Sequence, residues 1–423
     1  MNTAGLWDSI HFLLLTGTIE QDELGAKVWL ARAGGHGWPL TLKLGPDASV
    51  GYCVHFPPGA STIIKNLLPH SHRWKQLYCV LSWELFRLFS VVRSQLPSLE
   101  KLYIKLTGIP RIPKESHDAF ECAPRLASLT LMWACNFKLP WNDLKRLEIS
   151  PHENCSSATL RDILRECSSL THLKLWQIED KAPVDQAPLL LLHLTSIYLQ
   201  ITSDSLFFLD NLMLPALCDI TLDVIYTSQI WAHSGKFMLL LERSQGTINS
   251  ITLGCTHLWL ISEDDLLSCL RVLPELRELR ILDGAASALA IGSVLHYLTQ
   301  GDDDGTLIAP KLQFLRVPWT RSFFLDQPFA TMLESRWRSR VCTGDNTAHT
   351  GLQAVHVDVI YLHDHLESPF EPNCIPATMS TLFRCWKEGM DVRVTGYYLM
   401  GMIKDWFKDW ISEQEIKSNE PTM

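Results

Sequence analysis

One apolar pattern recurs along the chain: two apolar residues separated by two variable positions, followed after one more variable position by a third apolar residue. The clearest copies are LEKLYI from Leu99, LASLTL from Leu126, LTHLKL from Leu170 and LRELRI from Leu276. Copies start on average about 28 residues apart, which is within the range of leucine-rich repeats. The eleven copies begin at Trp74, Leu99, Leu126, Leu144, Leu170, Leu194, Leu217, Ile248, Leu276, Leu312 and Leu352.

The second half of each copy predicts a short strand. Its apolar positions alternate with variable ones, so a strand here buries one face and exposes the other. In the copy from Leu99 we expect Leu102 and Ile104 to be buried, and Lys101 and Tyr103 to point outward. Five copies carry proline two residues before their start, which holds the entering chain extended.

Helical periodicity separates these strands. Ser262 precedes three acidic residues, an arrangement typical of a helix N-terminus. The leucines that follow, at 266, 267, 270 and 273, share one helical face. Residues 157–167, 236–244 and 285–299 show the same kind of pattern. Each repeat is therefore expected to run strand, turn, helix, turn.

A chain of strand–helix repeats has two architectural solutions, an open horseshoe and a closed eight-repeat barrel. Barrel strands are buried on both faces, whereas the outward positions here are polar. Those positions include Thr130, Glu148, Lys174, Thr221, Thr252, Arg280, Arg316 and His356. We therefore predict an α/β fold, a leucine-rich-repeat-like solenoid (horseshoe) of about eleven strand–helix units. It should be irregular, because the Asn or Cys of regular repeats is missing eight residues after each start.

The two ends differ from the middle. A helix at 20–33 and a strand at 39–44 predict an N-terminal capping unit over 1–60, ahead of a solenoid over 61–395. Residues 396–412 are interpreted as a C-terminal capping helix, and 413–423 as a frayed tail. A partner-binding helix is the alternative for 396–412. Its apolar face would contain Leu399, Ile403, Trp406, Phe407 and Trp410.

Composition narrows the class of partner. The formal net charge of −9 argues against general nucleic-acid binding, and no apolar run is long enough to span a bilayer. We therefore expect no nucleic acid and no membrane as partner. The twelve cysteines form no C-x-x-C pair and are too dilute for a disulfide scaffold. They are interpreted as reduced, buried thiols of an intracellular protein, cytoplasmic or nuclear.

Eight longer phrases carry a resemblance to a family. They are LWDSI (6–10), WLARAGGHGWPLTLKL (29–44), LLPHSHRWKQL (67–77), FECAPRLASLTL (120–131), LPWNDLKRLEI (139–149), LLLERSQGTINSITL (239–253), ISEDDLLSCLRVLPELRELRI (261–281) and MLESRWRSR (332–340). With these phrases the chain resembles the F-box protein family of mushroom-forming basidiomycete fungi. The resemblance implies that the repeats recognise substrates for ubiquitination.

In that family an F-box precedes the LWDSI-like phrase and docks on a Skp-type linker protein, and through it on a cullin ubiquitin ligase. The given sequence starts five residues before this phrase, so we expect the F-box to be missing, by truncation or by loss of the ligase connection. The linker and the cullin are therefore expected as partners only if an F-box exists upstream.

Candidate chemistry is sparse. His363, Asp364 and His365, with His356 nearby, have the residue types and strand spacing of a metal site, but no fourth ligand is near in sequence. A polar loop is the preferred interpretation of these residues and of His70-Ser71-His72. Residues 302–304 are best explained as a solvated acidic turn, and 34–37 lack the ending of a phosphate loop. We expect no catalytic residue, no cofactor, no metal and no enzymatic activity.

The outward strand face is the candidate partner-binding surface, because aromatic residues and arginine are the usual anchors of interfaces. Trp176, flanked by Lys174 and Tyr198, forms the patch of this surface that should be mutated first. The alternative is that these residues form an ordinary solvated face, or that Trp176 packs under a neighbouring loop. The full set is Lys101, Tyr103, Arg146, Glu148, His172, Lys174, Trp176, Tyr198, Asp219, Asp223, Glu278, Arg280 and Arg316.

The predicted function is a non-catalytic protein–protein recognition module, which the resemblance makes the substrate-binding part of an F-box adaptor for a cullin-type ubiquitin ligase. One alternative is a free scaffold or decoy without a ligase connection. A second, less favoured, is an enzyme on a closed βα barrel.

Overall fold

The computed structural model describes residues 8–15, 17–34, 38–47, 54–108, 116–132, 137–150, 157–178, 188–201, 209, 211–224, 234–244, 247–255, 263–282, 292–300, 307–319, 326–342, 351–360, 375–397 and 403–419. By their contacts, the residues of the chain form two compact units. The N-terminal unit comprises Met1–Asp180 and Val184–Leu194, and the C-terminal unit comprises Lys181–Pro183 and Thr195–Met423.

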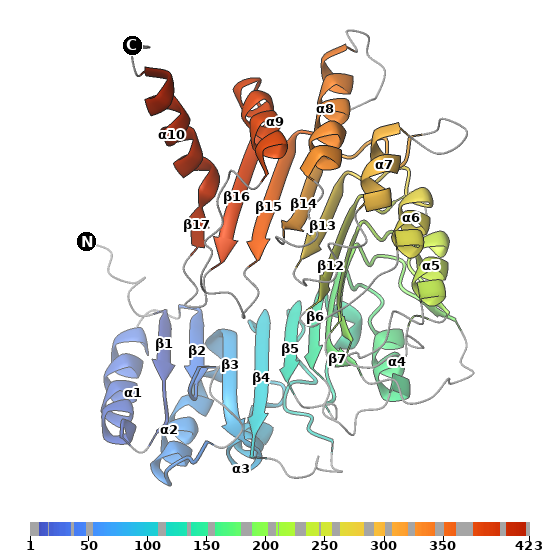
Figure 1. Cartoon of the computed structure of the whole chain (residues 1–423). Coiled ribbons are helices and arrows are strands. Elements are labelled where there is room, and N and C mark those ends of the chain that lie inside the picture. Colours follow the sequence, from blue (N-terminus) through green and yellow to red (C-terminus); the bar gives the residue numbers. More distant parts are fainter. Residues whose placement is uncertain are drawn as a thin grey trace. The chain divides into compact units, whose positions relative to one another are not determined.

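The N-terminal unit is built on a parallel sheet with the order β1-β2-β3-β4-β5-β6-β7 (Figure 1). Its strands are β1 (Ser9–Phe12), β2 (Leu40–Leu44), β3 (Trp74–Ser82), β4 (Lys101–Thr107), β5 (Ser128–Met132), β6 (Arg146–Ser150) and β7 (His172–Ile178), with a short β8 (Leu189–Leu190). Its helices are α1 (Ile19–Gly34), α2 (Gly59–Leu67), α3 (Trp83–Phe86) and α4 (Ser157–Glu166), with 3-10 helices η2 (Leu68–Arg73), η3 (Arg87–Val92) and η4 (Trp141–Asp143).

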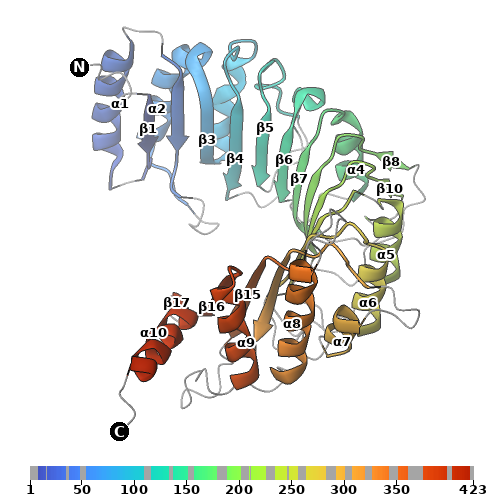
Figure 2. The same ribbon diagram turned by 90° about the horizontal axis from the view of Figure 1, so that it is seen from above.

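The C-terminal unit has the strand order β9-β11-β12-β13-β14-β15-β16-β17, in which only β17 is antiparallel to its neighbour. Its strands are β9 (Ser196–Ile201), β10 (Leu212–Met213), β11 (Asp219–Val224), β12 (Ser250–Cys255), β13 (Glu278–Leu282), β14 (Phe314–Trp319), β15 (Ala354–Ile360), β16 (Asp391–Tyr397) and β17 (Ile403–Asp405). Its helices are α5 (Ser234–Arg243), α6 (Glu263–Arg271), α7 (Gly292–Gln300), α8 (Asp326–Cys342), α9 (Pro376–Lys387) and α10 (Trp406–Asn419). Helices α5 to α9 lie side by side along one face of this sheet (Figure 2).

All eleven predicted repeats carry a strand, from β3 to β15. Apart from β3, which begins at Trp74 itself, each strand begins two residues after the first apolar position of its copy. Equivalent apolar residues are aligned across the ladder, as with Leu102, Leu129 and Leu147, and they are buried. The prediction of an α/β, irregular leucine-rich-repeat-like solenoid is confirmed. The closed barrel is wrong, because in neither unit does the order of the described strands return to its first strand.

A helix in every repeat was too regular an expectation. Helices α4, α5 and α6 occur where the periodicity predicted them, and the apolar face of α6 is buried. Between β5 and β6, however, the described residues contain only the 3-10 turn η4. The reason is length: the copies at Leu126 and Leu144 start 18 residues apart, which leaves no room for an α-helix and its two turns. Helix α7 begins at Gly292, and the earlier part of the predicted segment lies outside the described residues.

Both ends of the chain gain strands that the sequence did not predict. The expected N-terminal helix and strand are present as α1 and β2, and β1 adds a further parallel strand beside β2. At the other end, the predicted helix over 396–412 has the wrong bounds. Residues 403–405 form β17, which pairs with β16, and α10 continues to Asn419, into the segment expected to fray. Cross-strand pairing holds Ile403 in a strand, although its spacing from Trp406 and Trp410 suits a helix; Leu399 lies outside the described residues.

Two buried arginines form hydrogen bonds to backbone carbonyls of neighbouring loops and helix ends. Arg336 of α8 donates three hydrogen bonds to backbone carbonyls, to Leu298 O (2.6 Å), Ile308 O (2.6 Å) and Ala309 O (3.0 Å). In the N-terminal unit Arg73 bonds the carbonyls of Ala33 (2.6 Å) and Trp38 (3.0 Å) in the same manner. These guanidinium groups satisfy carbonyls that the ends of helices and the loops leave without a partner.

Six of the cysteines are described as free thiols: Cys79, Cys122, Cys167, Cys218, Cys269 and Cys385. Burial raises the pKa of Cys167 and Cys269 to about 12 each, and it raises that of Cys79 further. The expectation that the cysteines are buried fails at Cys122, which is exposed. Separately, none of the helices in the described ranges combines the length and the apolar composition needed to cross a bilayer.

Candidate functional site: the polar faces of the two sheets

The alternation placed the thirteen predicted surface residues correctly. Each lies on a strand, and each is exposed or half-buried. Seven, from Lys101 to Trp176, belong to the N-terminal unit, and six, from Tyr198 to Arg316, belong to the C-terminal unit. The patch predicted around Trp176 and Tyr198 therefore divides between the two units, and its halves are described separately. That these residues bind a partner remains a prediction.

A continuous row of side chains crosses the polar face of the N-terminal unit. It takes one residue from each strand between β2 and β7: Lys43, Tyr78, Tyr103, Thr130, Glu148 and Lys174, each aligned with the next. The rings of Tyr78 and Tyr103 stack with centroids 5.9 Å apart, and Lys43 Nζ lies 5.6 Å from the Tyr78 centroid. Burial, helped by the negative charge of Glu148, raises the pKa of Tyr103. This central row thus joins an aromatic half to a charged half.

Trp176 lies at the charged end of the central row. Its indole Nε1 donates to Glu148 Oε1 at 2.8 Å, and Lys174 Nζ lies 3.9 Å from the same oxygen and 4.9 Å from the Trp176 ring. Thr130 Oγ1 donates to the other carboxylate oxygen of Glu148 at 3.4 Å. We call these four residues the Trp176 cluster. Hydrogen bonding and the cation above the ring fix the orientation of a half-buried indole.

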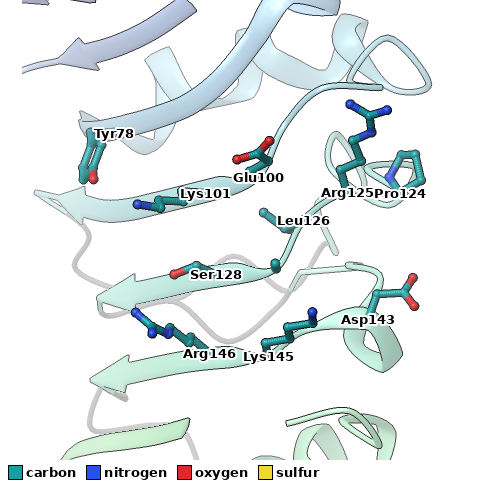
Figure 3. Close-up of a pocket in the computed structure, with 11 residues that line it drawn as sticks. Tyr78, Glu100, Lys101, Pro124, Arg125, Leu126, Ser128, Asp143, Lys145 and Arg146 are labelled. Atoms are coloured by element: carbon teal, nitrogen blue, oxygen red, sulfur yellow. The ribbon is translucent and has the colours of Figure 1, made fainter. Parts of the chain in front are cut away.

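A second row lies beside the central row, two residues earlier on each strand. It contains Gln76, Lys101, Ser128, Arg146 and His172. Three residues of this row, Lys101, Ser128 and Arg146, line an open groove together with the loops that enter β4, β5 and β6 (Figure 3). The groove has a volume of about 770 Å³. The groove-lining residues are Tyr78, Glu100, Lys101, Pro124, Arg125, Leu126, Ala127, Ser128, Asp143, Lys145 and Arg146.

In the C-terminal unit the predicted residues on β9 and β11 form hydrogen bonds across these two strands. Tyr198 Oη and Gln200 Nε2 both donate to Asp223 Oδ2, at 3.0 and 3.1 Å. Ser196 Oγ donates to Asp219 Oδ2 at 3.1 Å. The carboxylates of Asp219 and Asp223 are therefore already engaged by neighbouring side chains.

Basic residues line up further along the strands of this unit, and carboxylates lie beside them. Arg280, Arg316, His356 and Arg393 are aligned across β13 to β16. Arg280 pairs with Glu278 (2.8 Å), Arg316 with Asp358 (2.5 Å), and Arg393 with Asp391 (3.5 Å). His356 Nε2 lies 3.8 Å from Asp391, while burial and the nearby Arg393 lower its pKa.

Sequence reasoning missed Asp358, Asp391 and Arg393 as members of this face. The last two lie on β16, whose sequence DVRVTGY alternates but lacks the leading apolar residues of the repeat pattern. The alternation alone was the signal that could have found them.

The metal candidates add nothing to these faces. Residues 363–365 and 302–304 lie outside the described residues, as do 35–37 of the glycine-rich segment. His70 and His72 lie on η2. In the part of the chain that the structure describes, no group of three or more His, Cys, Asp or Glu residues could hold a metal ion.

Comparisons with known proteins add little. No family model matches the chain, and no curated protein matches it. Among solved structures, one that is similar is the crystal structure of a TLR13–ssRNA13 complex, at 15% sequence identity and a TM-score of 0.42. The similarity covers 70% of this chain and spans 40% of the length of that chain.

Proposed function

We propose that the protein is a non-catalytic protein–protein recognition module and that it binds its partner through the polar face of the N-terminal unit. The observation that carries this proposal is the Trp176 cluster, in which Glu148 and Lys174 orient a half-buried indole on an otherwise polar surface. Tryptophan is among the residues most enriched at interface hot spots.

Preorganisation supports this role. A side chain that is already held in one orientation loses less conformational freedom when it is covered by a partner. The stacked rings of Tyr78 and Tyr103 lie in the same row as Glu148. They add two amphipathic aromatic side chains to the contact surface that Trp176 provides. An indole whose N–H is already satisfied by Glu148 can be covered without leaving a buried donor unpaired.

The resemblance to basidiomycete F-box proteins supports a more specific proposal: this module is the substrate-binding part of an adaptor for a cullin-type ubiquitin ligase. A free scaffold or decoy is the second candidate, because the same surface could hold a partner without delivering it to a ligase.

The test is partner capture in the native cell with the protein tagged at its C-terminus, using the wild type and a Trp176→Ala variant. Proteins retained by the wild type and lost by the variant support the recognition module. Co-purified cullin and its linker protein support the adaptor, and partners without any ligase component favour the scaffold. Equal recovery of all partners by both chains contradicts the placement of the site.

A further inference from the structure

The groove on the N-terminal unit is formed by a difference in side-chain length. Strand β5 and the loop entering it contribute the small residues Ala127 and Ser128. The neighbouring strands contribute long cationic residues, Lys101 from β4 and Arg146 from β6 (Figure 3). Because Ser128 is aligned with both Lys101 and Arg146, the small residues form a floor between two cationic walls.

The lining of this groove is basic. Lys101, Arg125, Lys145 and Arg146 all line it and are exposed, whereas its acidic members are Glu100 and Asp143. Of these two acids, Glu100 pairs with Lys75 at 3.5 Å. The excess of positive charge runs against the net charge of −9 of the whole chain.

The cations of the groove also differ from those of the C-terminal sheet. There, Arg280, Arg316 and Arg393 each have a carboxylate within 4 Å. Within the described ranges, no carboxylate lies that close to any of the four cationic side chains of the groove. The groove lining carries four cationic and two acidic side chains, and its cations are not neutralised in close ion pairs within the described ranges. They therefore repel one another, and an incoming anion relieves that repulsion as well as forming new bonds.

We propose that this groove binds an acidic segment of the protein partner, through its Asp and Glu carboxylates. The inference rests on the proposed function and deepens it by naming the chemistry of the partner. Each of the two groove arginines can donate two parallel hydrogen bonds to one carboxylate, and the two lysines add compact positive charges. Arg146 is only two residues from Glu148 on β6, so the groove lies beside the Trp176 cluster.

A short acidic peptide fits these observations better than a polynucleotide does. Nucleic-acid binding draws its affinity from an extended series of phosphate contacts. The cations of the groove lie on β4 and β6 or in the loops that enter β5 and β6. The second row continues beyond them as Gln76 on β3 and His172 on β7, and neither of these lines the groove. The central row beside the groove also carries the negative charge of Glu148, which disfavours the phosphates of a polynucleotide.

The test measures fluorescence anisotropy on the full chain with three probes: a short peptide of alternating Asp and Gly, its Asn counterpart, and single-stranded DNA of equal charge. The wild type should bind the Asp peptide at least about tenfold more tightly than the Asn peptide. The double variant Lys101→Ser, Arg146→Ser should lose at least about tenfold in affinity for the Asp peptide. A matched control removes an exposed lysine of α2 and an exposed arginine of α4, as Lys65→Ser, Arg165→Ser, and should change the affinity by less than about twofold.

Three results would overturn the proposal: equal affinity for the Asp and Asn peptides, equal losses in the two double variants, or tighter groove-dependent binding of the DNA than of the Asp peptide. These outcomes are separable from failure of the proposed function. If the peptide test fails while partner capture still depends on Trp176, only the acidic-segment inference is wrong. If the peptide binds but no partner depends on Trp176, the recognition site has been misplaced.

Discussion

Arg316 and Asp358 lie on neighbouring strands, and the Nε of Arg316 is 2.5 Å from Oδ2 of Asp358. The Asp358 side chain is only 5% exposed, against 27% for Arg316. Thr395 Oγ1 donates to the second carboxylate oxygen at 3.0 Å. A residue predicted from sequence as a partner contact therefore has a structural role, which is to neutralise a buried carboxylate on the polar face of the sheet.

Replacing Asp358 with alanine should destabilise the protein by about 1–3 kcal/mol, because both Arg316 and Thr395 lose their acceptor. Urea denaturation followed by circular dichroism measures the change. Glu23→Ala serves as the control, since it breaks only the exposed Glu23–Lys27 pair and should cost less than about 0.5 kcal/mol. Equal losses of stability in the two variants would show that the buried Arg316–Asp358 pair stabilises the protein no more than the exposed pair does.

Arg336→Met keeps most of the apolar stem of the side chain and removes three hydrogen bonds to backbone carbonyls. The expected loss of stability is about 2–4 kcal/mol, because the carbonyls around Ile308 are left buried without donors. Arg338→Met is the matched control: its side chain is 70% exposed, and the change should cost less than about 0.5 kcal/mol. A loss of less than about 0.5 kcal/mol in Arg336→Met would show that these hydrogen bonds do not stabilise the loop that contains Ile308 and Ala309.

The stability of the protein should fall on acidification, in part through His117. This imidazole is buried beside the rings of Phe86 (4.8 Å) and Trp83 (5.8 Å). Burial lowers its pKa below the ordinary value of 6.5; the charge of Arg87 adds to this shift and that of Asp118 opposes it.

Since the unfolded chain binds the proton more readily, the stabilisation is complete above about pH 6.5 and is lost as the pH falls through the folded-state pKa. The check is to compare urea midpoints at neutral and mildly acidic pH for the wild type and for His117→Phe. The variant should lose less stability on acidification than the wild type does. If the wild type and the variant lose the same stability on acidification, His117 is not a cause of that loss.

Thiol labelling should separate the described cysteines by burial. Cys122 is exposed, whereas Cys79, Cys167 and Cys269 are buried and their pKa values are raised. Iodoacetamide reacts with the thiolate, so Cys122 should label quickly in the native protein and the other three only after unfolding. Peptide mass spectrometry resolves the sites. Native labelling of Cys79 at the rate of Cys122 would contradict the packing of β3.

The strands of the repeats could be predicted from sequence because the alternation within each strand identifies the residues of its buried face. Leu102 and Ile104 alternate with Lys101 and Tyr103, and no distant partner is needed to see this. The end strands β1 and β17 are short, and pairing with β2 and β16 holds them in place, which local periodicity does not record. The start of α10 was misplaced for the same reason, because β17 occupies the residues just before Trp406.

The candidate site was predictable only in part. Alternation placed Trp176 on the polar face, but it could not show that Glu148, 28 residues earlier, accepts its N–H. Nor could it separate Arg316, paired with a carboxylate 42 residues away, from the groove cations Lys101 and Arg146. Outward direction is set by the two-residue period of a strand, whereas charge pairing depends on which strands become neighbours.

The most direct test of the central claim is the affinity of a captured partner for two double variants of the N-terminal unit, measured by isothermal titration calorimetry. Tyr103→Ala, Trp176→Ala removes aromatic anchors from the polar sheet face, and Leu24→Ala, Val28→Ala removes exposed apolar side chains from α1. We predict that the first variant loses at least about thirtyfold in affinity, about 2 kcal/mol, and that the second loses less than about twofold. Equal affinities for the two variants would contradict the claim that this sheet face is the recognition surface.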